Sequence, residues 1–252
     1  MIKIWILTLL SVFMVSLISL IGVVIFAWDK KRLQDILLFL VSFAVGGLFG
    51  DALIHLIPEA FEKLGLHLAT SLLILAGVLI FFVLEKFLHW QHCHVPTSKE
   101  HVHPVVTINL VGDAIHNLMD GLIIGASFLV SIPIGITTTL AVVLHEIPQE
   151  IGDFGILLHK GLTVKKALLY NFLSALTAVV GAVISLLIGP HVAGYTTVLL
   201  PVTAGGFLYI AGSDLIPELH HHSDHFNWRA TLLQFVCIVL GISVMALLKL
   251  LE

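Results

Sequence analysis

The sequence predicts an all-α integral membrane protein, and two observations carry that prediction. Hydrophobic residues make up 58% of the 252 positions and charged residues only 11%, and the mean hydropathy is +1.08. A soluble domain carries about 25% charged residues. In addition, apolar segments of about 20 residues recur along the whole chain, and each is long enough to cross a bilayer as a helix. The connections between them are short, so no soluble domain is expected.

Eight such segments follow one another. They are expected at residues 4–28, 35–61, 67–90, 105–130, 133–159, 164–189, 193–219 and 228–251. The first resembles a signal peptide because Lys3 precedes it, but its apolar run exceeds the roughly 7–15 residues of a signal sequence and no small-residue cleavage site follows. We therefore expect a retained helix. The two cysteines, Cys93 and Cys237, are too few for a disulfide framework.

An internal repeat supports the helix count. Gly46-Gly47 precedes Leu56-Ile57-Pro58-Glu59 by the same interval as Gly205-Gly206 precedes Leu215-Ile216-Pro217-Glu218, an offset of 159 residues. The second and seventh helices would run in opposite directions, which indicates an inverted repeat, a common plan in transporters. The prediction is a 3+2+3 arrangement: helices 1–3 in residues 1–90, a loop at 91–104, helices 4–5 in 105–159 and helices 6–8 in 160–252.

The basic residues predict the orientation, because Lys and Arg are enriched in cytoplasmic loops. The loops after helices one, three, five and seven and their borders hold nine of them: Lys30, Lys31, Arg32, Lys86, Lys99, Lys160, Lys165, Lys166 and Arg229. The opposite side holds Lys3, Lys63 and Lys249. We expect both termini outside, the histidine-containing loop 91–104 in the cytoplasm, and the plasma (inner) membrane as the location.

The fourth and fifth helices carry polar residues at membrane depth. An ionisable side chain there costs about 2.5–3.5 kcal/mol on insertion scales. On helix four, Asn109, Asp113, His116, Asn117 and Asp120 form one stripe at helical spacing, and on helix five His145, Glu146, Gln149, Glu150 and Asp153 recur over two turns. Such a double stripe must line a wet cavity or bind something. A polar network that only locks the two helices together is the alternative.

Imidazole and carboxylate together favour Zn²⁺ and other first-row divalent ions. Pro148 removes one backbone hydrogen bond from helix five and clashes with the carbonyl of Leu144, so a carbonyl could turn toward the site. No cysteine lies among these residues, so the site suits an ion that is bound and then released. We expect seven metal-contacting residues: His116, Asn117, Asp120, His145, Glu146, Gln149 and Glu150.

The sequences His116-Asn117-x-x-Asp120-Gly121 and His145-Glu146-x-Pro148-x-Glu150 resemble the fourth- and fifth-helix signatures of the ZIP (Zrt/Irt-like) metal transporter family. The resemblance covers nearly the whole chain, including Gly50-Asp51-x-x-x-His55-x-x-Pro58-Glu59 on helix two. It implies eight helices with outside termini. It also implies movement of Zn²⁺, or of Fe²⁺, Mn²⁺ or Cd²⁺, toward the cytosol through a site between helices four and five.

By position, the resemblance implies a primary metal site of His116, Asp120, His145 and Gln149, with Asn117 and Glu146 in an adjacent second position. Two residues depart from the family. Gln149 stands where the related branch usually has histidine, and a neutral oxygen is a weaker ligand for zinc. Ala178 stands where other branches place a carboxylate on helix six, which counts against a filled two-metal site.

Further polar residues are expected along a path to and from this site. His55 and Glu59 are candidates for the entrance, and Asp113, Asp153, Asp214 and Glu218 for the exit. For each of these residues alone, a helix-end role is the alternative. Two histidine-rich loops are candidates for loose cytoplasmic metal binding, through His92, Cys93, His94, His101, His103, His220, His221 and His222. The alternative is a polar connector without a metal function.

The predicted function is therefore transmembrane transport of a divalent cation, most plausibly Zn²⁺, toward the cytoplasm. A membrane metal sensor or channel and an integral membrane zinc hydrolase are the alternatives. An enzyme is not expected, because His-Glu-x-x-His places a second histidine where this chain has Gln149. The expected partners are the metal ion as transported substrate and the lipid bilayer, with a homodimer left open; no organic cofactor and no nucleic acid are expected.

Overall fold

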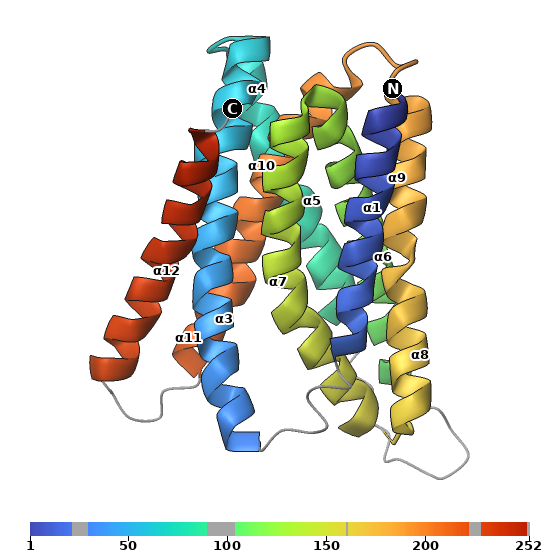
Figure 1. The fold of residues 1–252 in the computed structure, drawn as a ribbon, viewed down its shortest axis with the longest axis vertical. Coiled ribbons are helices and arrows are strands. Elements are labelled where there is room, and N and C mark those ends of the chain that lie inside the picture. The colour runs from blue at the N-terminus through green and yellow to red at the C-terminus, as the bar shows by residue number, and fades with distance from the viewer. Residues whose placement is uncertain (22–29, 90–103, 160, 222–227, 251–252) are drawn as a thin grey trace.

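The described part of the protein is built from helices (Figure 1). The structure is a computed structural model and describes residues 1–21, 30–89, 104–159, 161–221 and 228–250. The first half contains α1 (Ile2–Ile18), the short helix η1 (Ser19–Ile21), α3 (Lys30–Gly50), η2 (Asp51–Leu56), α4 (Ile57–Leu64) and α5 (Leu68–His89). The second contains α6 (Pro104–Val130), α7 (Ile132–His159), α8 (Val164–Ala175), α9 (Thr177–Ile188), α10 (Tyr195–Tyr209), η3 (Ile210–Leu215), α11 (Ile216–His221) and α12 (Trp228–Lys249).

The composition of these helices fits a membrane protein. Within the described ranges, seven helical segments are long and apolar enough to cross a bilayer. The predicted fifth span, α7, has 28 residues but does not belong to that set. Polar side chains such as His145, Glu146 and Glu150 lower its hydropathy. The all-α membrane class is confirmed.

The predicted helix boundaries need three corrections. Predicted helix six divides at Leu176 into α8 and α9. Predicted helices two and seven each contain a π-helical stretch, η2 and η3, in which the backbone takes one extra residue per turn. Each stretch ends just before the Ile-Pro-Glu sequence that the repeat contains, and the two stretches are 159 residues apart, the interval of the repeat.

The helices form two packed groups. In one, α6 and α7 pack against each other and against α1, α8 and α9; in the other, α3 packs against α12 and α5 against α10. Contacts of α3 with α7 and of α10 with α6 join the groups. In Figure 1, α3 and α12 lie at the left and α1, α8 and α9 at the right, with the N- and C-termini at the same end of the bundle. The core between them contains Leu48, Phe128, Val142 and Phe207.

Glycine allows the closest helix contacts. A Cβ atom added at Gly121 of α6 would collide with the carbonyl oxygen of Ala178 in α9, and one added at Gly181 of α9 would collide with the carbonyl oxygen of Leu118 in α6. Such small residues let backbones approach in membrane helices, where packing replaces the hydrophobic drive. The same reciprocal contact joins α3 to α12 through Gly46 and Gly241, and α5 to α10 through Gly77 and Gly205.

Candidate metal centre

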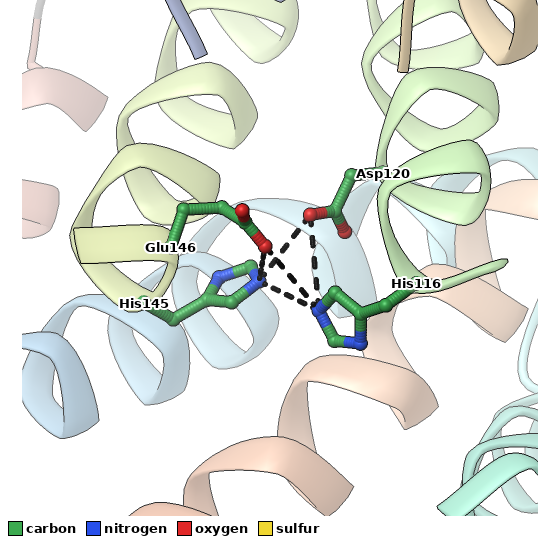
Figure 2. Close-up of side chains that lie close together, drawn as sticks. All are labelled: His116, Asp120, His145 and Glu146. Carbon is green, nitrogen blue, oxygen red and sulfur yellow. Dashed lines mark hydrogen bonds and ion pairs between the residues drawn. The ribbon is translucent and has the colours of Figure 1, made fainter. Parts of the chain in front are cut away.

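Four side chains from α6 and α7 converge at one point in the bundle (Figure 2). His116 and Asp120 are one helical turn apart on α6, so they share a face. His145 and Glu146 come from the antiparallel helix α7 and meet them from the other side. One ligand atom from each residue can be chosen so that all four lie within 4.8 Å of one another. The sequence predicted that these helices meet, and the structure brings these four residues together.

The distances fit a single tetrahedral ion. The two Nε2 atoms of His116 and His145 are 3.2 Å apart. Asp120 Oδ2 lies 3.8 Å from His116 Nε2 and 3.4 Å from His145 Nε2, and Glu146 Oε1 lies 3.6 and 3.7 Å from the same two atoms. Ligands bound about 2.0–2.2 Å from a tetrahedral zinc ion lie about 3.3–3.6 Å from one another. The four atoms therefore need to move only slightly to hold such an ion.

The carboxylates of this cluster are buried without hydrogen-bond donors. Asp120 and Glu146 are both fully buried, and none of their four oxygen atoms accepts a well-directed hydrogen bond from a described residue. A buried charged oxygen without a donor is costly. A bound cation would remove that cost.

The orientation of His145 is fixed by the backbone. Its Nδ1 atom lies 3.1 Å from the carbonyl oxygen of Ala141, one turn earlier on α7. When Nδ1–H donates to this carbonyl, the lone pair of Nε2 points toward His116 and the two carboxylates. A second partner of this kind is the usual way in which a metal-binding histidine is oriented.

Two aromatic rings from the other helix group form a wall of the cluster. The ring of Phe81 on α5 meets the imidazole of His116 edge to face at 6.2 Å between centroids. Phe207 on α10 meets His145 in the same way at 6.1 Å. Both phenylalanines are buried, so they keep this side of the cluster dry and place it where the two helix groups meet.

Glu146 and Gln149 differ in their positions relative to the cluster. The resemblance put Glu146 in an adjacent position, whereas its Oε1 atom approaches both Nε2 atoms of the cluster as closely as Asp120 does. Glu146 is therefore part of the main cluster. Gln149, assigned to the primary site, is partly buried one turn after His145 on α7, and its role as a ligand stays a prediction.

A second polar network lies further along α6 and α7, toward the end of α7 and the start of α8. Asn117 donates through Nδ2 to Asp113 Oδ1 at 2.8 Å, and the Ser174 hydroxyl of α8 donates to Asp113 Oδ2. Asn171 of α8 donates through Nδ2 to Glu150 Oε2. Asn117 and Glu150 thus belong to this network, beside the four-residue cluster.

Sequence reasoning missed Asn171 and Ser174. Both are polar, both are buried, and they are three residues apart on α8, so they share one face. Polar spacing on an otherwise apolar helix was the signal that could have identified them. Asp153, predicted on the exit path, accepts a hydrogen bond from Asn109 Nδ2 at 2.9 Å.

The remaining predicted residues lie away from the cluster. His55 is fully buried and its Nε2 lies 2.9 Å from the carbonyl oxygen of Met245 in α12, so it belongs to a helix interface and is not exposed at an entrance. Glu59 forms an ion pair with Lys63 at 3.1 Å.

Other predicted residues fall outside the described part of the structure. The side chains of Asp214 and Glu218 are not described, although their backbones belong to η3 and α11. The predicted loop ligands also fall outside the described residues, either entirely or in their side chains: His92, Cys93, His94, His101, His103, His220, His221 and His222.

Comparison with known proteins gives a consistent family. A family model described as "ZIP Zinc transporter" matches residues 2–106 and 96–249. "Zinc transporter zipt-7.1" of Caenorhabditis briggsae is 31% identical over 99% of this chain and 80% of its own length. "Zinc transporter ZIP13" of Pongo abelii is 38% identical over 89% of the chain and 68% of its own length.

"Zinc transporter ZIP4" of Rattus norvegicus is 33% identical over 84% of the chain, and the match spans 43% of that relative. The chain therefore matches most of some relatives and less than half of others. With the family model covering nearly all residues, this chain belongs to the ZIP zinc transporter family.

Proposed function

We propose that this protein transports divalent metal cations, with Zn²⁺ as the main substrate, across a membrane toward the cytoplasm. The observation that carries the proposal is the cluster of His116, Asp120, His145 and Glu146. Two nitrogens and two carboxylate oxygens lie at tetrahedral spacing inside apolar helices. The relatives named above, all zinc transporters, support the same cargo.

The donor set suits an ion that has to be released. Two imidazoles favour Zn²⁺ over Mg²⁺ or Ca²⁺, whereas thiolates would bind it more tightly. Among the described residues, the cluster contains no sulfur ligand. Fe²⁺, Mn²⁺ and Cd²⁺ use overlapping donors and are further substrates to be compared, with Gln149 as a weaker ligand next to the cluster.

The proposed architecture has eight spans arranged 3+2+3, with an inverted repeat of spans 1–3 and 6–8. The support is the occurrence of π-helices η2 and η3 at the same interval as the repeated sequence. The reciprocal glycine contacts of α3 with α12 and of α5 with α10 also pair the repeats symmetrically. In this arrangement α7 is the fifth span and brings the total from seven to eight, although its polar residues lower its hydropathy.

The proposed orientation has both termini outside, in the plasma (inner) membrane. Nine of twelve Lys and Arg residues then belong to the cytoplasmic side. In this orientation Glu59 lies toward the entrance, and Asp113 and Asp153 toward the exit. The histidine-rich segments at 91–104 and 220–222 would then meet the released metal in the cytoplasm.

We expect the site to alternate between the two sides by movement of one helix group against the other. α1, α8 and α9 pack on the two helices that carry the cluster, so these five can move together. The wall made by Phe81 and Phe207 belongs to the other group. Sliding past this wall would open the cluster to water on one side and then on the other.

The direct test is metal uptake into proteoliposomes. Zn²⁺, Fe²⁺, Mn²⁺ and Cd²⁺ are compared for wild type, His116→Ala and His145→Ala. We expect saturable Zn²⁺ uptake that falls at least 100-fold in either variant. Thr203→Val is the matched control, because Thr203 is equally buried but its hydroxyl bonds only to the Leu199 carbonyl among described residues.

Other outcomes would point to other functions. Metal binding without any uptake would indicate a sensor, and uptake that does not saturate would indicate a channel. Metal-dependent peptide cleavage without uptake would indicate a hydrolase. Saturable uptake that survives both histidine substitutions would place the transport site elsewhere.

A further inference from the structure

The second polar network has an organisation of its own. Asn171 and Ser174 share a face of α8, and each reaches a carboxylate on a different neighbouring helix. Asn171 donates to Glu150 on α7, and Ser174 donates to Asp113 on α6. Asn171 Nδ2 also lies 3.5 Å from the backbone carbonyl oxygen of Ser19. Four segments of one helix group therefore converge here.

The network is buried and rich in carboxyl groups. Glu150 is fully buried, and Asp113 is 4% exposed. The carboxyl groups that neighbour Glu150 are Asp113 and Asp153, and those that neighbour Asp113 are Asp153 and Asp120. Carboxylates taken out of water need a compensating positive charge.

Oxygen atoms without partners remain in the network. Glu150 Oε1 and Asn171 Oδ1 are buried and have no hydrogen-bond partner among the described residues. Oδ1 and Nδ2 of Asn171 belong to one amide group, so the free oxygen is part of the same network as the Glu150 carboxylate that the nitrogen contacts. A buried oxygen atom without a donor is costly, and a cation bound by these oxygens would remove that cost.

We propose that Asp113, Glu150 and Asn171 form a second cation position, which holds a divalent metal through oxygen atoms alone. The Ser174 hydroxyl and the Ser19 carbonyl oxygen complete its surroundings. This position is distinct from the adjacent one that the family resemblance implies, because Asn171 lies seven residues, two helical turns, before Ala178 on the sixth span.

The chemistry of the two positions differs in a useful way. Zn²⁺ is held well by the imidazoles of the first cluster, whereas a site made only of oxygen suits harder ions such as Mn²⁺ and holds Zn²⁺ less tightly. An ion that leaves His116 and His145 for this position would be closer to release. The second position would thus bind the ion between the first cluster and release. This role rests on the proposed transport function.

Binding of Mn²⁺ to the full chain in detergent tests the position without measuring transport. Equilibrium dialysis counts bound ions, and electron spin echo modulation detects coupling of Mn²⁺ to imidazole nitrogen. Wild type should bind two Mn²⁺, one with imidazole coupling and one without. The variant with both His116→Ala and His145→Ala should keep one Mn²⁺ without nitrogen coupling.

Two substitutions of Asn171 should change the affinity of the second position for Mn²⁺ in opposite directions. Asn171→Leu removes the oxygen and should weaken the uncoupled Mn²⁺ at least tenfold, while the coupled Mn²⁺ stays. Asn171→Asp adds a carboxylate and should strengthen the uncoupled ion, so a folding defect in the leucine variant cannot decide the matter. Thr203→Val is the control and should bind like wild type.

The Mn²⁺ measurements distinguish an error in the second position from an error in the proposed transport site. A wild type that binds a single Mn²⁺, always with imidazole coupling, would overturn the second position and leave the first intact. An uncoupled Mn²⁺ unaffected by both Asn171 variants would overturn it as well. A wild type that binds no imidazole-coupled Mn²⁺ would instead contradict the proposed transport site.

Discussion

The Nε2 atom of His145 must be unprotonated to bind a metal. Its Nδ1 contacts the Ala141 carbonyl, so the proton belongs on Nδ1 and the lone pair of Nε2 faces the cluster. Protonation of Nε2 turns the ligand into a cation that repels the metal. The same holds for His116, whose Nε2 is 3.2 Å away. The two histidines therefore connect metal binding to pH.

Zinc uptake should fall in acid. Protons compete with the metal for the imidazole nitrogens and the carboxylate oxygens, so the metal-binding form is lost as the pH falls. We expect the initial rate in proteoliposomes, measured with equal pH on both sides, to drop severalfold between about pH 7 and pH 5.5. A rate that stays constant over this range would argue against imidazole ligands.

A substitution at Gln149 tests how the ligand atoms of the site control its selectivity between metals. Replacing it with histidine offers an imidazole nitrogen one turn after His145, and nitrogen binds Zn²⁺ better than an amide oxygen does. Gln149→His should lower the KM for Zn²⁺ about tenfold while changing that for Mn²⁺ less. Competition of Mn²⁺ against radioactive Zn²⁺ in the variant and wild type measures this. Equal shifts for both metals would show that Gln149 does not choose between them.

At the scale of elements, the contact of α6 with α9 positions the helix that carries His116 and Asp120. A methyl group at Gly121 would collide with the Ala178 backbone carbonyl, which cannot move without moving α9. Overpacking of this kind costs about 1–3 kcal/mol. A substitution that pushes α6 away from α9 should therefore also lower the stability of the protein.

Gly121→Ala should lower the melting temperature of the protein in detergent and reduce uptake. Gly152→Ala is the matched control, because a Cβ at Gly152 on α7 meets no atom within 4 Å. The control should melt at or slightly above the wild-type temperature, since alanine favours a helix over glycine by about 1 kcal/mol. Equal melting of the two variants would show that the α6–α9 contact tolerates expansion.

The π-helical stretches show what the sequence could predict about an element. The interval of 159 residues was visible in the repeated glycines and Ile-Pro-Glu sequences, and η2 and η3 lie at that interval. The π geometry itself was not predictable from hydropathy, because one extra residue per turn leaves the apolar composition unchanged. The break at Leu176 between α8 and α9 was missed for the same reason.

At the scale of the whole molecule, packing divides the helices differently from their order in the chain. α1, α8 and α9 join α6 and α7, whereas α3, α5, α10 and α12 form the other group. Groups of consecutive spans moving against the central pair, as the order of the chain suggests, would have to separate α6 from α9. The close glycine contact between them opposes that.

A reversible cross-link between the groups should stop transport. The Thr138 hydroxyl of α7 lies 3.3 Å from Asp51 Oδ2 in η2, so Asp51→Cys and Thr138→Cys can be joined in a chain whose own cysteines are serine. We expect uptake to fall at least tenfold on cross-linking and to return with reductant. The control is a Ser16→Cys, Ala175→Cys pair within one group, where the Ser16 hydroxyl donates to the backbone carbonyl of Ala175; this pair should stay active.

The sequence predicted the class of fold and the two helices whose polar residues form the cluster, because both depend on composition and helical spacing. Two helices with polar stripes must turn those stripes toward each other, so His116, Asp120 and His145 were identified. Glu146 was assigned to the neighbouring position by the family resemblance, whereas in the structure its Oε1 atom lies in the four-residue cluster. Asn171 and Ser174 were missed because their partners lie on other helices.

Zinc uptake by Glu146→Gln and Gln149→Ala, measured side by side in proteoliposomes, tests the central claim most directly. The claim is that the transported ion is held by His116, Asp120, His145 and Glu146. It predicts that Glu146→Gln lowers kcat/KM for Zn²⁺ at least 100-fold, whereas Gln149→Ala lowers it less than tenfold. The reverse order, with Glu146→Gln near wild type and Gln149→Ala inactive, would contradict it.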